Sequence, residues 1–425
     1  MEQGSTPWNA LRLTLPALLG LFIVGIPTGF LSSLTTLRLD TLGYSSLVVG
    51  AVSSAYFLGL TFGAVFNDRV IARVGHIRAY SGFACLITVT ALLQGLSANA
   101  WAWTLLRFFY GWAVVGVYLV IESWLLLSSS PKARGQILAI YMVALYGSTM
   151  LAQLQLGAIM AAGPSAPFLI AGVLVSLSTL PIVLLPRTTP AVERLEPLPL
   201  RQAYKLAPTG VVGCFGSGLV IAAVYALLPL YLQRSGYSSV QVGRLMACTI
   251  LGAMLLQYPV GRWSDHQDRR TVLVVLGAAL LLTSLCLVAL PFTYATLVWP
   301  LFVLGGIVFT IYPVSVSLAA DRASSAKLIP MIQGLLLINS AGSALSPLAI
   351  SAVMGRLGAR GFAWSFALIG ALLVLFFLWR KGSRAAPEEA TPFAPAPPIS
   401  PLGVELRVTE ELARDEAVGE ETVAP

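Results

Sequence analysis

The sequence predicts an all-α integral membrane protein in which about twelve transmembrane helices form two pseudo-symmetric six-helix bundles. Three observations predict this fold class. The chain is 57% hydrophobic and only 10% charged, whereas soluble domains carry about 25% charged residues. Apolar runs of about 20 residues, each long enough to cross the hydrocarbon core of a bilayer, recur from Leu13 to Leu378. A polar, proline-broken stretch near the middle separates the first six runs from the last six.

The expected helices follow these apolar runs, with short turn-like segments between them. In chain order we expect spans at 12–37, 46–66, 77–97, 100–127, 134–161, 165–185, 208–233, 239–260, 270–290, 294–319, 328–354 and 361–380. Residues 1–9 lack the basic segment and cleavage site of a signal peptide, so the first run is expected to remain in the membrane.

Composition divides the chain into four parts. We expect an N-terminal six-helix bundle at 1–186, a cytoplasmic linker at 187–207 and a C-terminal six-helix bundle at 208–382. The remaining segment, 383–425, is rich in proline, alanine and acidic residues and has little to bury. It is therefore expected to be a disordered cytoplasmic tail.

The distribution of Lys and Arg predicts the orientation of the spans. Eighteen of these residues fall in one alternating set of loops and span ends, and five in the other: Arg38, Arg234, Arg244, Arg356 and Arg360. By the positive-inside rule the first set is cytoplasmic. Both chain ends are then cytoplasmic, and the number of spans is even.

The sequence also argues against several other classes of protein. The formal charge of +8 lies in short loops between apolar runs rather than on one basic face, so no nucleic-acid partner is expected. The four cysteines are far apart within apolar runs, which predicts neither disulfides nor a zinc site. With both histidines in loops and no P-loop, we expect no metal, no cofactor and no enzymatic activity.

Two equivalent loops, after the second and the eighth span, carry related glycine, acidic and arginine residues. Such a cluster can latch neighbouring helices on the cytoplasmic side, although cytoplasmic charges also serve orientation alone. The candidate latch residues are Asp68, Arg69, Arg73 and Arg78 in the first copy and Gly261, Asp265, Asp268, Arg269 and Arg270 in the second.

The second copy resembles the loop signature of the major facilitator superfamily (MFS), whose members have two six-helix bundles around a central cavity. The first copy departs from that signature because Asn67 stands where an acid is expected. A closer resemblance, to the YcaD-like branch of this superfamily, covers residues 12–381. It is carried by Val70 to Gly75, Leu106-Arg107-Phe108, Ile121 to Trp124, Ala139 to Met142, Gln257 to Asp265 and Tyr312-Pro313. The resemblance implies transport and names no substrate.

Two ionisable residues lie at membrane depth in the fourth span, where charge is costly and usually functional. Arg107 and Glu122 are fifteen residues apart and fall on one side of the helix with Tyr118. Arg107 is a candidate for anion binding or proton coupling, and bonding to backbone carbonyls is the structural alternative. Glu122 is expected to pair with Arg73 or Arg78, and carrying a proton is its alternative role.

Polar residues in other spans are further candidates for contact with a solute. The first span has a stripe with Thr28 and Ser32, and the eleventh has Asn339 in a similar stripe with Ser343 and Ser346. Because spans 1, 4, 7 and 10 line the cavity in MFS members, the resemblance adds Tyr225 and Tyr312. Helix–helix hydrogen bonding is the alternative role of all these side chains.

The sequence as a whole thus predicts a secondary active transporter of a small solute, multi-pass and monomeric in the bacterial cytoplasmic membrane. Coupling to protons remains open. The alternative is a membrane sensor or scaffold that has a transporter fold but moves no solute.

Overall fold

The computed structural model describes residues 7–128, 134–183, 198–290, 293–323 and 325–382. Within these ranges the chain is helical and contains no strand. Twelve of the described helices are long and apolar enough to cross a membrane. The expected all-α fold class with twelve spans is confirmed.

The first half of the chain supplies six of these spanning helices and one short helix. They are α1 (Pro7–Thr41), α2 (Ser46–Val74), α3 (His76–Leu96), α4 (Ala100–Ser128), α5 (Arg134–Leu154), the short α6 (Leu156–Ala161) and α7 (Ala166–Val183). The second half supplies the short α8 (Leu200–Leu206), α9 (Pro208–Arg234), α10 (Ser239–His266), α11 (Arg269–Ala289), α12 (Tyr294–Ala320), α13 (Ser325–Leu357) and α14 (Arg360–Lys381).

Several helices are longer than their apolar runs indicate, and two of these, α2 and α10, carry the charged motifs. α2 continues to Val74 and α10 to His266, so the two charged motifs lie partly in the last turns of these helices and not wholly in loops. The expectation of loops was wrong because hydrophobicity ends at the first charge, whereas backbone hydrogen bonding continues past it. α2 ends at Gly75, whose φ of 84° is a backbone conformation that favours glycine.

Two short helices also depart from the expected pattern. The expected span 134–161 is divided at Gln155 into α5 and α6. α8 lies within the expected linker 187–207, and the Leu198 N–H donates to the Pro330 carbonyl of α13 at 2.8 Å. Residues 184–197 of that linker and the expected tail 383–425 lie outside the described residues. The division into domains therefore stays a prediction.

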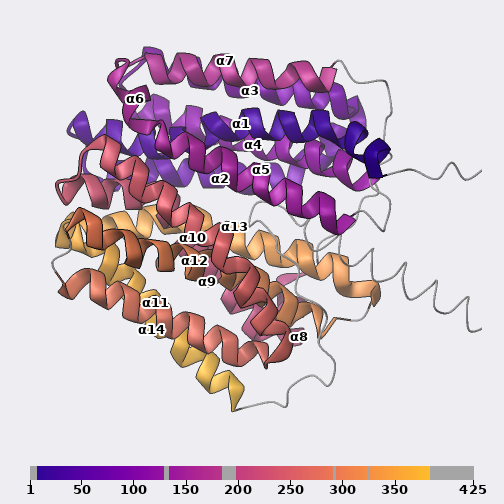
Figure 1. The fold of residues 1–425 in the computed structure, drawn as a ribbon, viewed down its shortest axis with the longest axis vertical. Helices are drawn as coiled ribbons and strands as arrows, with labels where there is room; N and C mark the ends of the chain where they lie inside the picture. The colour runs from indigo at the N-terminus through magenta and orange to yellow at the C-terminus, as the bar shows by residue number, and fades with distance from the viewer. Residues whose placement is uncertain (1–6, 129–133, 184–197, 291–292, 324, 383–425) are drawn as a thin grey trace, which may run out of the picture.

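The spanning helices run side by side, with α1 to α7 gathered in one part of the molecule and α9 to α14 in the other (Figure 1). Because successive spans reverse direction, α1 begins and α14 ends on the same side. We call this side, which also holds α8, the linker end. The opposite side, with the turns 42–45, 162–165 and 235–238, is the far end.

Glycines allow the closest helix pairs in both groups. α2 packs extensively against α4, and α10 against α12. A methyl group on Gly111 of α4 would overlap the Tyr56 carbonyl of α2, and one on Gly305 of α12 would overlap the Thr249 carbonyl of α10. Each half of the chain thus uses a small residue to bring its second and fourth spans into backbone contact.

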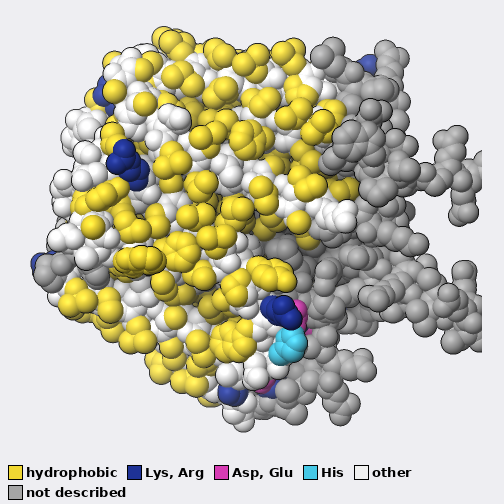
Figure 2. Space-filling view, viewed as in Figure 1, with side chains coloured by type: hydrophobic (Ala, Val, Ile, Leu, Met, Phe, Trp, Pro, Cys, Tyr) yellow, Lys and Arg dark blue, Asp and Glu magenta, His cyan; other side chains and the backbone are white. Residues whose placement is uncertain are grey.

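The outer surface suits a hydrocarbon environment. In the view of Figure 2, apolar side chains cover most of the face, and the charged side chains lie toward the two ends of the helices. Trp101, Tyr258 and Trp299 are 84%, 73% and 71% exposed. Exposing large apolar side chains to this extent costs free energy in water but not in lipid.

Candidate functional site

A cavity of about 80 Å³ lies between the two groups of helices. α1, α2, α4 and α5 line one side, and α9, α12 and α13 the other. Its lining combines aromatic rings and hydroxyl groups with small or aliphatic side chains: Thr28, Gly29, Ser32, Tyr56, Phe57, Leu60, Ala64, Val115, Tyr118, Leu145, Tyr146, Thr149, Ile221, Tyr225, Phe309, Ser340 and Ser343. None of these described residues carries a charge.

The aromatic side chains of the lining contact one another across the boundary between the two groups. Phe309 of α12 lies edge to face against Tyr225 of α9, with ring centroids 5.5 Å apart, and against Tyr146 of α5 at 6.0 Å. Edge-to-face packing is the favoured geometry for aromatic pairs and fixes the orientation of each ring. These contacts, one of which joins the two halves of the chain, therefore hold the three aromatic rings in defined orientations at the cavity.

Four of the candidate residues line this cavity: Thr28, Ser32, Tyr118 and Tyr225. The hydroxyls of Thr28 and Tyr118 are 3.2 Å apart and share a hydrogen bond between α1 and α4. Thr28 also donates to the Val24 and Gly25 carbonyls of its own helix. Two hydroxyl groups on this side of the cavity are thus hydrogen-bonded within the protein.

Arg107 lies outside the cavity lining and is 2% exposed. Its guanidinium carbon is 4.5 Å from the ring centroid of Tyr56 and 5.1 Å from that of Tyr110. Among the described residues, its Nε and Nη1 have no hydrogen-bond partner, so these two atoms make no bond to a backbone carbonyl there. Cation–π contact with two tyrosines is the stabilisation that the structure provides for this buried charge. Tyr56 contacts both Arg107 and the cavity.

Glu122 is 3% exposed and accepts a hydrogen bond from the Tyr141 hydroxyl of α5. It also lies outside the cavity lining, one helical turn from Tyr118. The expected ion pair with Arg73 or Arg78 is not formed in the described part of the chain. The structure thus links the carboxylate to a neighbouring span.

Two further candidates, Asn339 and Tyr312, are buried away from the cavity lining. The Asn339 amide donates to the Cys214 carbonyl at 3.1 Å and to the Ser217 hydroxyl at 2.7 Å, which ties α13 to α9. Tyr312 is 1% exposed within α12. The contacts of Asn339 are those of a helix–helix bond between spans.

Gln153 makes the matching contact in the first half of the chain. Its amide donates to the Gly29 carbonyl and the Ser33 hydroxyl, both at 2.9 Å, which ties α5 to α1. An amide of the fifth span holds the first span, as Asn339 of the eleventh span holds the seventh. The internal repeat therefore extends from the charged motifs to buried hydrogen bonds.

The second copy of the candidate latch forms an ion-pair cluster at the linker end. Arg269 lies 2.5 Å from Asp321 and 3.2 Å from Asp265, and Arg270 lies 3.2 Å from Asp268. These pairs connect the end of α10, the start of α11 and the residue after α12. Gly261, the remaining member of this copy, is buried in α10 one turn before Asp265. Asp321 was not among the candidates, although its place directly after an apolar span could have indicated it.

The first copy has different contacts. Asn67 is buried and faces Trp112 of α4: its amide donates to the Trp112 carbonyl at 3.0 Å and accepts from the indole N–H at 2.6 Å. Asp68, Arg73 and Arg78 make no ion pair among the described residues. Arg69 lies 5.3 Å from the ring of Phe66. The substituted asparagine thus bonds within its own group of helices.

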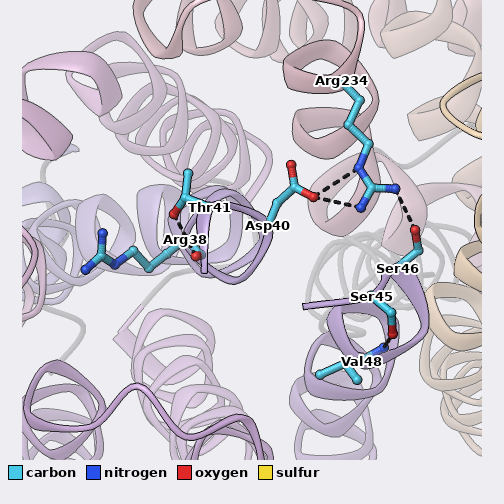
Figure 3. Close-up of polar contacts among 7 residues, drawn as sticks. All are labelled: Arg38, Asp40, Thr41, Ser45, Ser46, Val48 and Arg234. Carbon is cyan, nitrogen blue, oxygen red and sulfur yellow. Dashed lines mark hydrogen bonds and ion pairs between the residues drawn. The ribbon is translucent and has the colours of Figure 1, made fainter. Parts of the chain in front are cut away.

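Direct bonds join the two groups at the far end. Figure 3 shows Arg234, the last residue of α9, between Asp40 near the end of α1 and Ser46 at the start of α2. Its guanidinium donates to Asp40 at 2.7 and 3.0 Å and to the Ser46 hydroxyl at 2.6 Å. Thr36 of α1 donates to the Ala226 carbonyl of α9 at 2.8 Å. The two groups are bonded together on the far side of the cavity.

Several cavity residues were missed by sequence reasoning. Tyr56, Tyr146, Phe309 and Ser340 line the cavity but were not among the candidates. The sequence analysis took its candidates from the first, fourth, seventh, tenth and eleventh spans, whereas the structure adds α2 and α5. A tyrosine within an otherwise apolar span was the available signal, since its hydroxyl needs a partner.

Comparison with known proteins gives consistent similarities. Residues 17–336 match the family described as Major Facilitator Superfamily. An MFS-type transporter of Yersinia enterocolitica is 33% identical over 387 residues, which cover 90% of this chain and 98% of the relative. The MFS-type transporter YcaD of Escherichia coli is 33% identical over 333 residues, 77% of this chain and 85% of the relative.

Solved structures share the fold at lower identity. The crystal structure of the nucleoside transporter NupG has a TM-score of 0.71 and 15% identity, covering 87% of this chain and 98% of that protein. A D-xylose–proton symporter has a TM-score of 0.70 and 14% identity, covering 89% and 98%. These likenesses concern the arrangement of helices and carry no information on the solute.

Proposed function

Because this chain belongs to the major facilitator superfamily, we propose that it is a secondary transporter that moves a small solute across the cytoplasmic membrane by alternating access. In this proposal the cavity is the solute site, and the two groups of helices rock about it. The linker end faces the cytoplasm, because the loops on that side hold most of the Lys and Arg.

The observation that carries the proposal is the position of the cavity relative to the bonds between the groups. Residues from both groups line it, while the Asp40–Arg234 pair and the Thr36–Ala226 bond lie toward the far end. Such contacts shut one side of a central site, and they must break for the site to open there. This is the arrangement that alternating access requires of one of its two states.

The proposal is tested by measuring solute flux before and after the far end is cross-linked. This test does not require the solute to be known in advance. The four native cysteines are replaced by serine, and Asp40→Cys and Arg234→Cys allow a short thiol-reactive cross-linker to fix the far end closed. Liposomes containing this chain are loaded with a bacterial metabolite extract, and the solutes that leave are identified by mass spectrometry. We expect at least one solute to leave before cross-linking and to be retained after it.

Controls separate transport from the alternative of a sensor. Chains with Asp40→Cys alone receive the same reagent and are expected to remain active. If no solute leaves liposomes that contain the uncross-linked protein, or if cross-linking leaves the flux unchanged, alternating-access transport is contradicted. Solute binding without flux would then support a sensor.

We further propose that Arg107 and Glu122 couple solute movement to protons. Both are buried at membrane depth beside residues that line or adjoin the cavity. Liposomes enclosing a pH-sensitive dye would report proton movement during flux of an identified solute. We expect Arg107→Gln or Glu122→Gln to abolish the pH signal; a solute that crosses without any proton movement would contradict the coupling.

A further inference from the structure

The cavity surface combines aromatic rings with hydroxyl groups and carries no formal charge. Six of its residues are tyrosine or phenylalanine, and the Thr and Ser residues add further hydroxyls. Flat rings bind well against such walls through stacking and edge contacts. The surrounding hydroxyls can donate and accept hydrogen bonds, so they suit neutral polar groups.

One tyrosine of the lining has a buried hydroxyl that lacks a partner among the described residues. The Tyr146 hydroxyl is buried and makes no hydrogen bond with any described residue, while its side chain lines the cavity. By contrast, the Tyr118 hydroxyl bonds to Thr28. Buried polar groups are rarely left unpaired in folded proteins, so a ligand that reached this hydroxyl would satisfy it.

The buried charges near the cavity contact tyrosine side chains. Tyr56 and Tyr110 flank Arg107, and Tyr141 bonds to Glu122; neither charge belongs to the lining. A charged solute would therefore lose its hydration without gaining a direct ionic partner, which is strongly unfavourable. An uncharged solute avoids this loss.

We propose that the cavity binds an uncharged solute that has one aromatic or heteroaromatic ring and at least one hydroxyl or amide group. The ring packs against Phe309 and Tyr225, and the polar group bonds to the Tyr146 hydroxyl. A volume of about 80 Å³ is below the roughly 300–1,000 Å³ of pockets for drug-sized ligands, which favours a small solute. Calling this ligand the transported solute rests on the proposed function.

Matched probes that differ in charge test the proposal directly. One series shares a phenol ring: tyrosol is neutral, 4-hydroxyphenylacetate is an anion and tyramine is a cation. A second shares a phenyl ring: 2-phenylethanol, phenylacetate and phenethylamine. Binding of each to the full chain in lipid nanodiscs is measured by calorimetry, with empty nanodiscs subtracted to remove partition into lipid. We expect the neutral member of at least one series to bind at least about ten-fold more tightly than either ion.

Variants test whether this binding occurs in the cavity. Tyr146→Phe removes only the unpaired hydroxyl and is expected to weaken the neutral probe by roughly 2- to 10-fold, the effect of one hydrogen bond. It should leave the binding of 4-ethylphenol, which has the ring but no side-chain hydroxyl, unchanged. Phe309→Leu should weaken every ring-containing probe. Tyr258→Phe, an exposed position on α10, is the matched control and should change nothing.

Each result decides the proposal. It is overturned if an ion binds as tightly as its neutral partner, if no neutral probe binds, or if Tyr146→Phe and Phe309→Leu both bind like the parent. Thermal unfolding of each ligand-free variant shows whether lost affinity reflects lost folding. The comparison of neutral and charged probes needs only the unmodified chain, so it does not depend on how the variants fold. Failure here leaves the proposed transport intact, because the cross-linking assay identifies a transported ion as readily as a neutral solute.

Discussion

Individual residues show how polar groups are accommodated among apolar helices. Asn67 replaces the acid of the family's loop signature, and its amide bonds reciprocally to Trp112 of α4. Glu122 is bonded to Tyr141, and Arg107 is flanked by Tyr56 and Tyr110. In a medium that offers no water, each of these polar side chains takes a partner from a neighbouring helix. Residue identity at such positions therefore reports helix packing as well as function.

The Asn67–Trp112 contact is expected to contribute measurably to stability. Asn67→Ala and Trp112→Phe should each lower the free energy of unfolding by about 1 kcal/mol, since each leaves a buried polar group with one bond fewer. The double variant should reveal a coupling of roughly 0.6 kcal/mol, as is usual for bonds between membrane helices. Unfolding in mixed micelles measures all four proteins, and Trp101→Phe, at an exposed position, serves as control. Strictly additive effects would contradict a direct bond.

Glu122 offers a second comparison at this scale. Glu122→Gln keeps an acceptor for the Tyr141 hydroxyl, whereas Glu122→Leu leaves that buried hydroxyl without this bond. We expect Glu122→Leu to be less stable than Glu122→Gln by about 1–3 kcal/mol, the usual cost of an unpaired buried donor. Thermal unfolding of both variants provides the measurement. Equal stability would show that the hydrogen bond is unimportant to the fold.

At the scale of elements, glycines determine how closely the helices approach. Gly111 brings α4 against α2, and Gly305 brings α12 against α10. The two pairs occupy corresponding places in the two halves, as do the amide contacts of Gln153 and Asn339. This correspondence in backbone contact and hydrogen bonding is more complete than the similarity of the two loop sequences. The repeat is therefore clearer in the packing between spans than in the charged motifs.

A single methyl group should distinguish packed from unpacked glycines. Gly111→Ala places its methyl group on the Tyr56 carbonyl, so α2 and α4 must separate, and we expect a loss of about 1–3 kcal/mol. Gly147→Ala, in α5, meets nothing within 4 Å. It should be neutral or stabilising, because alanine favours a helix over glycine by roughly 0.5–1 kcal/mol. Thermal unfolding of the two variants is the measurement, and a similar effect of both would contradict the close approach.

For the whole molecule, the far-end contacts are expected to determine which conformation of the proposed cycle is populated. Arg234 joins α9 to both α1 and α2, while Gly50 of α2 lies against Pro347 and Ser351 of α13. These contacts connect the two groups of helices without lining the cavity. Their strength relative to contacts at the linker end therefore sets the balance between states in the proposed cycle.

A bulky side chain at Gly50 should open the far end. Gly50→Val overlaps the Pro347 carbonyl and Ser351, and a loss of one or two kcal/mol in the closed state would change the ratio of states by roughly 5- to 30-fold. Spin labels at Leu42→Cys and Leu357→Cys, in the chain without native cysteines, are expected to show a longer distance population. Gly355→Val is the control, since that glycine meets nothing within 4 Å. An unchanged distance distribution would contradict the role of these contacts in closure.

The sequence by itself determined the membrane class and the number of spans, because hydrophobic length and the cost of charge in lipid act locally along the chain. Of the candidates for solute contact, Thr28, Ser32, Tyr118 and Tyr225 line the cavity. Only the tertiary structure decided that Arg107 and Asn339 lie against neighbouring helices, that Tyr146 and Phe309 line the cavity, and that Asp40 pairs with Arg234. These contacts join residues up to 194 positions apart. They depend on how the helices rotate and pack against one another, which the hydrophobic pattern of a single span does not specify.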